Sequence, residues 1–292
     1  MAAPETSTAR AQNWLLCGIP RAGSSLCCRL AGKVPNLVAL SEPIARDRSQ
    51  SAHGADAAVG LIESFVAETR TRALASGRVP TIHVEGRLDD DLVEPASPGL
   101  ARLRRSRGTQ GEIRVSSPLA AGFTLLVKHN ALFAALLSSL TGRFECLALI
   151  RNPVAVLASW QTVDLPIGRG RIPAAEQFDK QLKAHLDRER DVLRRQMTVL
   201  NWFFGQFRAH LPAHRVIRYE DVVQSGGAVL FQALGSREMP TERLANRNDG
   251  AAYSAADPPR LLAALLDEPG AWRRFYTSTD CMAVADAIGS KA

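Results

Sequence analysis

The sequence NWLLCGIPRAGSSLCCRL, residues 13 to 30, decides the fold. Its apolar start, Trp14 to Cys17, predicts a buried parallel strand, and Gly18 to Gly23 predicts a tight turn into a helix that begins at Ser24. Such a turn gathers free backbone N–H groups and the positive end of the helix dipole around one concavity. The stretch therefore predicts a phosphate or sulfate site, although an ordinary serine-capped turn has the same pattern.

The spacing of Gly18 and Gly23 matches the nucleotide-binding P-loop up to its second glycine. Ser24 stands where that motif has lysine, and Arg21 is the strong cation of the loop. A P-loop kinase or NTPase needs the lysine and an acidic magnesium ligand at a strand end, and neither is evident. That class stays an alternative, behind an anion site in which Arg21 replaces the lysine.

Pro20 to Ser25, PRAGSS, resembles the 5′-phosphosulfate loop of sulfotransferases that use 3′-phosphoadenosine 5′-phosphosulfate (PAPS), the bacterial and carbohydrate enzymes among them. The resemblance implies that the loop binds the sulfonated end of this donor. The residues implied are Arg21, Ala22, Gly23, Ser24, Ser25 and Leu26.

Two further segments resemble the same family. Arg151 follows a predicted buried strand, Leu147 to Ile150, and Ser159 comes eight residues later, as in the motif that holds the 3′-phosphate of PAPS. The run RYED, 218 to 221, resembles the family's Tyr-Glu-Asp marker. Arg247 loosely matches a C-terminal arginine-glycine segment that contacts the same phosphate.

Glu42 is the first candidate for a catalytic base. A second strand is predicted to end at Ser41-Glu42-Pro43, because proline keeps the residue before it extended. If this strand lies parallel beside the first, Glu42 emerges at the carboxyl edge of the sheet, where open α/β proteins bind ligands. The Glu-Pro pair resembles the glutamate near the acceptor in bacterial and carbohydrate sulfotransferases. A surface glutamate before a turn is the alternative.

Lys128-His129-Asn130 follows another predicted strand, Phe123 to Val127. It resembles the Lys-Thr-His segment of cytosolic sulfotransferases, in which lysine touches the transferring group and histidine is the base. Here histidine comes one residue earlier, and a strand that persisted through it would turn His129 away from the acceptor. We therefore rank Glu42 above His129. Asn130 is predicted to cap a helix that ends at Leu140.

The length of 292 residues and a hydrophobic fraction of 46% suit one large core. Alternating strands and helices predict a single α/β domain, a P-loop-like three-layer fold with a central, mostly parallel sheet flanked by helices. Within it we expect a donor loop at 10–40, an irregular excursion or lid at 87–122, the 3′-phosphate motif at 147–163 and a helical tail at 235–292.

The formal charge of +7 suits anionic ligands. A non-catalytic nucleic-acid or anion-binding protein is the rival interpretation, but only 6% of residues are aromatic. The densest basic run, 102 to 107, is predicted to be a solvated loop. No apolar run is long enough to span a membrane, and residues 1 to 10 lack a signal-peptide core, so we expect a cytoplasmic protein.

The five cysteines have no metal-binding spacing, and most lie in apolar segments where a thiol packs as a small hydrophobe. We expect no metal to be required. The resemblance implies transfer of a sulfuryl group from PAPS to a hydroxyl of a carbohydrate or another small-molecule alcohol, leaving PAP as product. Arg21 and Lys128 would stabilise the leaving phosphate, and Glu42 or His129 would take the proton.

Overall fold

The computed structural model describes residues 12–95, 103–115, 118–248, 253 and 256–290. Its centre is a five-stranded sheet in the order β2-β5-β1-β6-β7, in which all neighbours run parallel. The predicted α/β fold, a parallel sheet flanked by helices, is confirmed. The strands are β1 (Asn13–Gly18), β2 (Leu37–Ser41), β5 (Thr124–Lys128), β6 (Glu145–Ile150) and β7 (Val216–Arg218).

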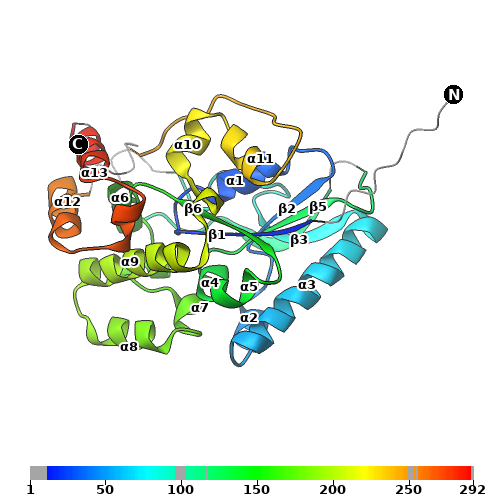
Figure 1. The fold of residues 1–292 in the computed structure, drawn as a ribbon, viewed down its shortest axis with the longest axis horizontal. Helices are drawn as coiled ribbons and strands as arrows, with labels where there is room; N and C mark the ends of the chain where they lie inside the picture. Colours follow the sequence, from blue (N-terminus) through cyan, green and yellow to red (C-terminus); the bar gives the residue numbers. More distant parts are fainter. Residues whose placement is uncertain (1–11, 96–102, 116–117, 249–252, 254–255, 291–292) are drawn as a thin grey trace.

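Helices cover both faces of this sheet (Figure 1). One face carries α1, with α10 and α11 beside it, and the other carries α3, α4, α5 and α9. Strands buried on both faces need nearly continuous apolar runs, which is why β1 and β6 read as LLC and CLALI. The helices in the first half of the chain are α1 (Ser24–Ala31), α2 (Arg46–Gln50), α3 (Ala55–Ser76), α4 (Asn130–Ala135) and α5 (Leu137–Leu140).

The second half of the chain is mainly helical. The long α9 buries Phe203, Phe204 and Phe207 in the core, as its apolar face predicts, and Phe275 of the tail stacks on Phe204 at 5.6 Å between ring centroids. The helices in this second half are α6 (Pro153–Gln161), α7 (Pro173–Glu176), α8 (Lys180–Arg188), α9 (Val192–His210), α10 (Tyr219–Gln224), α11 (Ala228–Ala233), α12 (Pro258–Asp267) and α13 (Ser278–Gly289), with 3₁₀ turns η1 (Pro166–Arg169), η2 (Ala213–Arg215) and η4 (Ala271–Arg274).

The second predicted strand has a different neighbour from the one we expected. β2 pairs with β5, not with β1, because β5 enters the sheet between them. Glu42 nevertheless emerges at the carboxyl edge, and its backbone N–H donates to the carbonyl of Lys128 at 2.7 Å. The expectation of an extended backbone before Pro43 is wrong, because Glu42 has a left-handed φ of 46°. The residues Thr81 to Val84 predict a further strand. In the structure this strand, β3 (Arg78–His83), lies outside the five-stranded sheet and pairs antiparallel with β4 (Thr109–Arg114).

Several predicted helices are interrupted. The sequence from Asp221 to Leu234 predicts one helix, but the structure divides it into α10 and α11, because Gly226 and Gly227 take left-handed φ values of 61° and 102°. The sequence from 174 to 207 predicts two helices, 174–186 and 187–207, but the structure forms α7, α8 and α9, with Asp179 and Asp191 capping the last two. Asn130 does not cap α4, because His129 remains extended and takes the N-cap position.

Candidate active site

The turn after β1 is backbone-strained and closely packed. Arg21 and Gly23 have positive φ values of 72° and 94°, and a Cβ on Gly18 would stand 2.8 Å from the carbonyl of Leu149. The first helical bond of α1 runs from the Cys27 N–H to the carbonyl of Gly23. The amides that precede Cys27 in α1 therefore lie ahead of the helical ladder, as an anion site requires. These are the amides of Ser24, Ser25 and Leu26.

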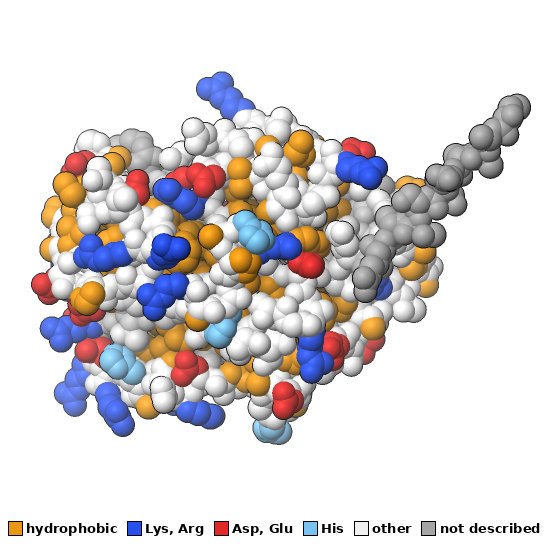
Figure 2. Space-filling view, viewed as in Figure 1, with side chains coloured by type: hydrophobic (Ala, Val, Ile, Leu, Met, Phe, Trp, Pro, Cys, Tyr) orange, Lys and Arg blue, Asp and Glu red, His pale blue; other side chains and the backbone are white. Residues whose placement is uncertain are grey.

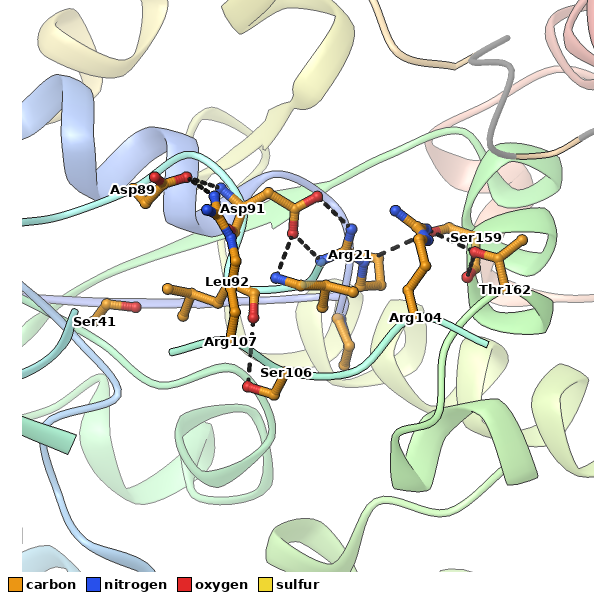
Figure 3. A network of polar contacts seen from close by, with 12 residues as sticks. Arg21, Ser41, Asp89, Asp91, Leu92, Arg104, Ser106, Arg107, Ser159 and Thr162 are labelled. Atoms are coloured by element: carbon orange, nitrogen blue, oxygen red, sulfur yellow. Dashed lines mark hydrogen bonds and ion pairs between the residues drawn. The ribbon is translucent and has the colours of Figure 1, made fainter. Parts of the chain in front are cut away.

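The Arg21 side chain points toward the chain segment after β3 (Figure 3). Its two terminal nitrogens donate to the two carboxylate oxygens of Asp91, at 2.6 and 2.8 Å, and its Nε donates to Ser159 Oγ at 3.4 Å. Burial raises the pKa of Asp91, but the Arg21 guanidinium outweighs this effect and holds it below its usual range. The carboxylate of Asp91 thus pairs with Arg21, the cation that was predicted to bind the sulfonated end of PAPS.

Arg151, directly after β6, is buried with 4% of its surface exposed. Its Nε donates to Asn248 at 2.7 Å, its Nη1 to the carbonyl of Arg21 at 3.0 Å, and its Nη2 to the carbonyl of Arg247. The guanidinium also lies over the ring of Tyr219, 4.6 Å from the centroid. Arg151 therefore joins the early turn to the C-terminal segment.

Tyr219 and Glu220 of the RYED run support this junction. A Cβ on Gly23 would lie 2.7 Å from the Tyr219 ring, so the ring seals the turn, and the Tyr219 hydroxyl accepts from the Arg247 N–H at 3.1 Å. Glu220 accepts from the Asn152 N–H, the Asn248 side chain and the Tyr276 hydroxyl, at 2.7 to 2.9 Å. The run holds Arg151 and its partners in place.

One cavity of about 690 Å³ opens at this edge of the sheet and is lined from both halves of the chain. Two predicted donor residues, Ala22 and Ser159, do not line it, because each is 0% exposed. Ser159 lies behind Arg21 and Tyr253. The other predicted site residues all line the cavity: Arg21, Gly23, Ser24, Ser25, Leu26, Glu42, Lys128, His129, Arg151 and Arg247.

Arg104 also lines the cavity, although its basic run was predicted to be a solvated loop. That prediction holds for Arg105 and Arg107, which are exposed, and is wrong for Arg104. Backbone hydrogen bonds to Thr162 and Asp164 fix Arg104 beside the end of α6. Its Nη2 donates to Thr162 Oγ1 at 2.6 Å, and within the described part of the chain its buried Nε has no partner.

The pKa of Arg104 reflects this crowded position. Burial lowers it first, and the neighbouring cations Arg21 and Arg151 lower it further, against the opposite effect of Asp91. Arg21 and Arg104 thus share the carboxylate of Asp91, and Arg151 adds a third positive charge near Arg104. No signal in the sequence distinguishes Arg104 from its neighbours, because its position depends on a backbone bridge to Val163.

Lys128 and Glu42 form an ion pair at the ends of β5 and β2. Lys128 Nζ is 2.8 Å from Glu42 Oε1, and the lysine side chain is only 3% exposed. Burial raises the pKa of Glu42, but Lys128 and then His129 outweigh it and lower the pKa to about 2. Glu42 is therefore ionised, and a weak base while this pair is intact.

His129 continues the extended backbone of β5, and its N–H donates to the carbonyl of Leu16. Its ring still lines the cavity, with Nε2 3.4 Å from the carbonyl of Ile44. Burial lowers the pKa of His129, against the opposite effect of Glu42, so the ring is neutral near pH 7. Beside it Asn130 has a buried Oδ1 without a partner in the described residues.

The described residues contain no group of three or more metal-ligating side chains. No helix among them is long and apolar enough to cross a bilayer. On the face seen in Figure 2, basic side chains are interspersed with acidic and hydrophobic ones.

Comparison with known proteins assigns no family to the chain. No protein-family model matches the chain, and no curated protein does. Among solved structures, the chain is similar to the sulfotransferase STF1 of Mycobacterium tuberculosis, with 11% sequence identity and a TM-score of 0.37. That match covers 97% of this chain and 78% of the mycobacterial one.

Proposed function

We propose that this protein is a sulfotransferase that takes its sulfuryl group from PAPS. The observation that carries the proposal is the meeting of Arg21 and Arg151, 130 positions apart in the chain, at one cavity through a 3.0 Å hydrogen bond. A donor that carries negative charge at both its 5′ end and its ribose needs cations from both places. ATP lacks the 3′-phosphate, so a site built this way favours PAPS.

In this proposal the turn holds the 5′-phosphosulfate and Arg151 with Arg247 holds the 3′-phosphate. Asp91 now occupies the two terminal nitrogens of Arg21, so the donor anion takes over those hydrogen bonds as it enters. Ser159 contacts the 3′-phosphate only if the Arg21 and Tyr253 side chains that cover it move aside.

The transfer itself forms a bond between the acceptor oxygen and sulfur and breaks the bond between sulfur and the 5′-phosphate oxygen, which leaves with the electron pair as PAP. The acceptor proton goes to Glu42 or to His129. Lys128 would turn toward the departing oxygen, and because it then no longer lowers the pKa of Glu42, the carboxylate becomes a better base. His129 is the alternative base, through Nδ1 when its Nε2–H donates to Ile44.

The proposal is tested by thermal unfolding with PAP, adenosine 5′-phosphate and MgATP, together with transfer from labelled PAPS. A ligand that binds only the folded state raises the melting temperature, so PAP should raise it far more than adenosine 5′-phosphate does. Arg151→Ala should remove most of that difference. Equal shifts for the two nucleotides, or a larger shift with MgATP, would overturn the proposal.

Activity of two variants ranks the proposed roles. Glu42→Ala should lose roughly 10²- to 10⁴-fold in transfer rate, the usual contribution of general-base catalysis, and retain measurable activity. Arg21→Ala should lose more, because it removes donor binding as well as charge stabilisation.

A further inference from the structure

Much of the lining of the cavity that contains Glu42 and Lys128 is apolar. Resting on the proposed function, we propose that the acceptor is an alcohol or phenol whose hydroxyl is carried on an apolar body, and not a sugar. The apolar residues come from the end of β3 and the segment after it, from the region of η1, and from the starts of α4 and α7; they include Ile82, Val93, Ala131, Leu165, Ile167 and Ile172.

These side chains are held in place by the core. Val93, Ile167 and Ile172 expose 3 to 4% of their surface, so they form a fixed wall of the cavity. Each methylene of a ligand buried against such a wall gains about 0.8 kcal/mol. The affinity for an acceptor should therefore increase with the length of its apolar chain or the area of its ring.

The polar groups in this part of the cavity are mostly engaged within the protein. Arg171 pairs with Glu176 and Asp187, and the Ser106 hydroxyl donates to the carbonyl of Leu92 at 3.4 Å. His129 contacts the carbonyl of Ile44. Asn130, which lines the same cavity as the Lys128–Glu42 pair, has one buried oxygen without a partner among the described residues. These groups leave little hydrogen-bonding capacity beyond that for one hydroxyl.

A sugar has several more hydroxyl groups. Each one buried without a partner costs about 1–3 kcal/mol, so a pyranose facing this wall loses several kcal/mol that an aliphatic alcohol does not. The polar lining thus discriminates against a polyol by leaving its hydroxyls unsatisfied, while the apolar lining favours a hydrocarbon.

The test compares acceptors that share a primary hydroxyl: ethanol, butanol, hexanol, octanol and glucose, with labelled PAPS at saturation. We expect kcat/KM to rise about threefold to fourfold for each methylene added, the equivalent of about 0.8 kcal/mol, and glucose to stay at or below ethanol. A kcat/KM independent of chain length, or a higher value for glucose, would overturn the inference.

Two leucines provide matched variants. Leu165→Ser should flatten the dependence on chain length and leave PAP binding unchanged, because the apolar Leu165 side chain lines the cavity without offering a hydrogen bond or a charge to PAP. Leu74→Ser is the control, since Leu74 is 46% exposed on α3 and does not line the cavity. The same flattening in both variants would contradict the role of the wall.

Binding of 2-naphthol, followed by its fluorescence, separates this inference from the proposed function. If PAP fails to stabilise the protein but 2-naphthol binds and Leu165→Ser weakens it, the donor assignment is wrong and the apolar site stands. If PAP binds and 2-naphthol does not, or no alcohol is sulfated, the acceptor inference is wrong and the donor site stands.

Discussion

At the scale of single residues, Arg104 adds a further positive charge to the cavity that Arg21 and Arg151 line. Arg21, Arg104 and Arg151 line the same cavity, and the carboxylate of Asp91 is bound to the first of them. Bringing cations together in a partly buried place is costly unless an anion joins them. The buried Nε of Arg104, which has no partner in the described part of the chain, would supply one more donor to such an anion.

Arg104→Gln should therefore weaken PAP binding about tenfold, or about 1.4 kcal/mol, as expected for loss of a charged hydrogen bond. Arg105→Gln is the matched control, because that neighbouring side chain is 66% exposed. It should change the dissociation constant less than twofold. Isothermal titration calorimetry at fixed ionic strength measures both dissociation constants. Equal losses of PAP affinity in the two variants would show that Arg104 does not bind PAP.

Glu42 gives a pH dependence of stability whose direction follows from its pKa. Lys128 holds the folded-state pKa of Glu42 at about 2, below the ordinary value of 4.5. The Lys128–Glu42 pair thus contributes fully to the stability of the fold at a pH above the ordinary pKa of 4.5. This stabilisation is lost as the pH falls toward the folded-state pKa of about 2. At pH 7, Glu42→Gln should cost about 2 kcal/mol of unfolding free energy, because it strands a buried ammonium.

That difference between wild type and Glu42→Gln should shrink as urea denaturation is repeated at pH 5, 4 and 3. Glu63→Gln is the control, since the exposed pair of Glu63 with Arg143 has the same 2.8 Å separation. An exposed pair contributes at most about 1 kcal/mol. A cost for Glu42→Gln that stays constant down to pH 3 would mean that its folded pKa is not depressed.

At the scale of single elements, Gly23 tests how the turn after β1 is matched to the start of α10. Alanine there meets both a φ of 94° and the Tyr219 ring, 2.7 Å from its Cβ. Gly77, which ends α3, has a φ of 63° but nothing within 4 Å of a Cβ. Alanine at either position would be strained by the left-handed backbone, and alanine at position 23 would also collide with the Tyr219 ring.

Gly77→Ala should therefore cost about 1 kcal/mol of unfolding free energy and leave PAP binding intact. Gly23→Ala should cost more, about 2–3 kcal/mol, and should also weaken PAP binding, because the turn must shift away from the ring. Thermal denaturation and calorimetry of both variants check this. Equal costs, with PAP affinity unchanged, would show that Tyr219 does not fix the turn.

The sequence predicts elements whose causes are local. For example, the apolar residues at helical spacing between Ala55 and Ser76, followed by Gly77, predict a helix with these bounds, and α3 has the same bounds. The motifs around Arg21 and Arg151 likewise predict the strand ends that the structure brings together. All five cysteines are free and buried, in keeping with their apolar neighbours.

What the sequence misses depends on distant contacts. The insertion of β5 between β1 and β2 is a choice among strand pairings that local pattern cannot rank. The ion pair of Arg21 with Asp91 joins residues 70 positions apart, and no sequence motif around either residue predicts the other as its partner. Arg104 lies within a run of arginines, and only its bridge to Val163 turns it toward the cavity.

At the scale of the whole molecule, the cavity depends on both halves of the chain. Its walls include the turn at Gly23, the ends of β5 and β6, and Arg247 with Tyr253 near the C-terminal helices. Glu220 joins these parts through Asn152, Asn248 and Tyr276. A nucleotide bound there contacts parts of the chain that come together only when the whole sheet and its helices have folded.

PAP should therefore stabilise the molecule as one cooperative unit. At 100 times its dissociation constant a ligand adds about 2.7 kcal/mol, which for a chain of this size raises the melting temperature by about 5 °C or more. Differential scanning calorimetry should give one transition that moves upward steadily with the logarithm of PAP concentration. Two transitions, of which PAP moves only one, would mean that the donor site belongs to a part of the chain that folds independently of the rest.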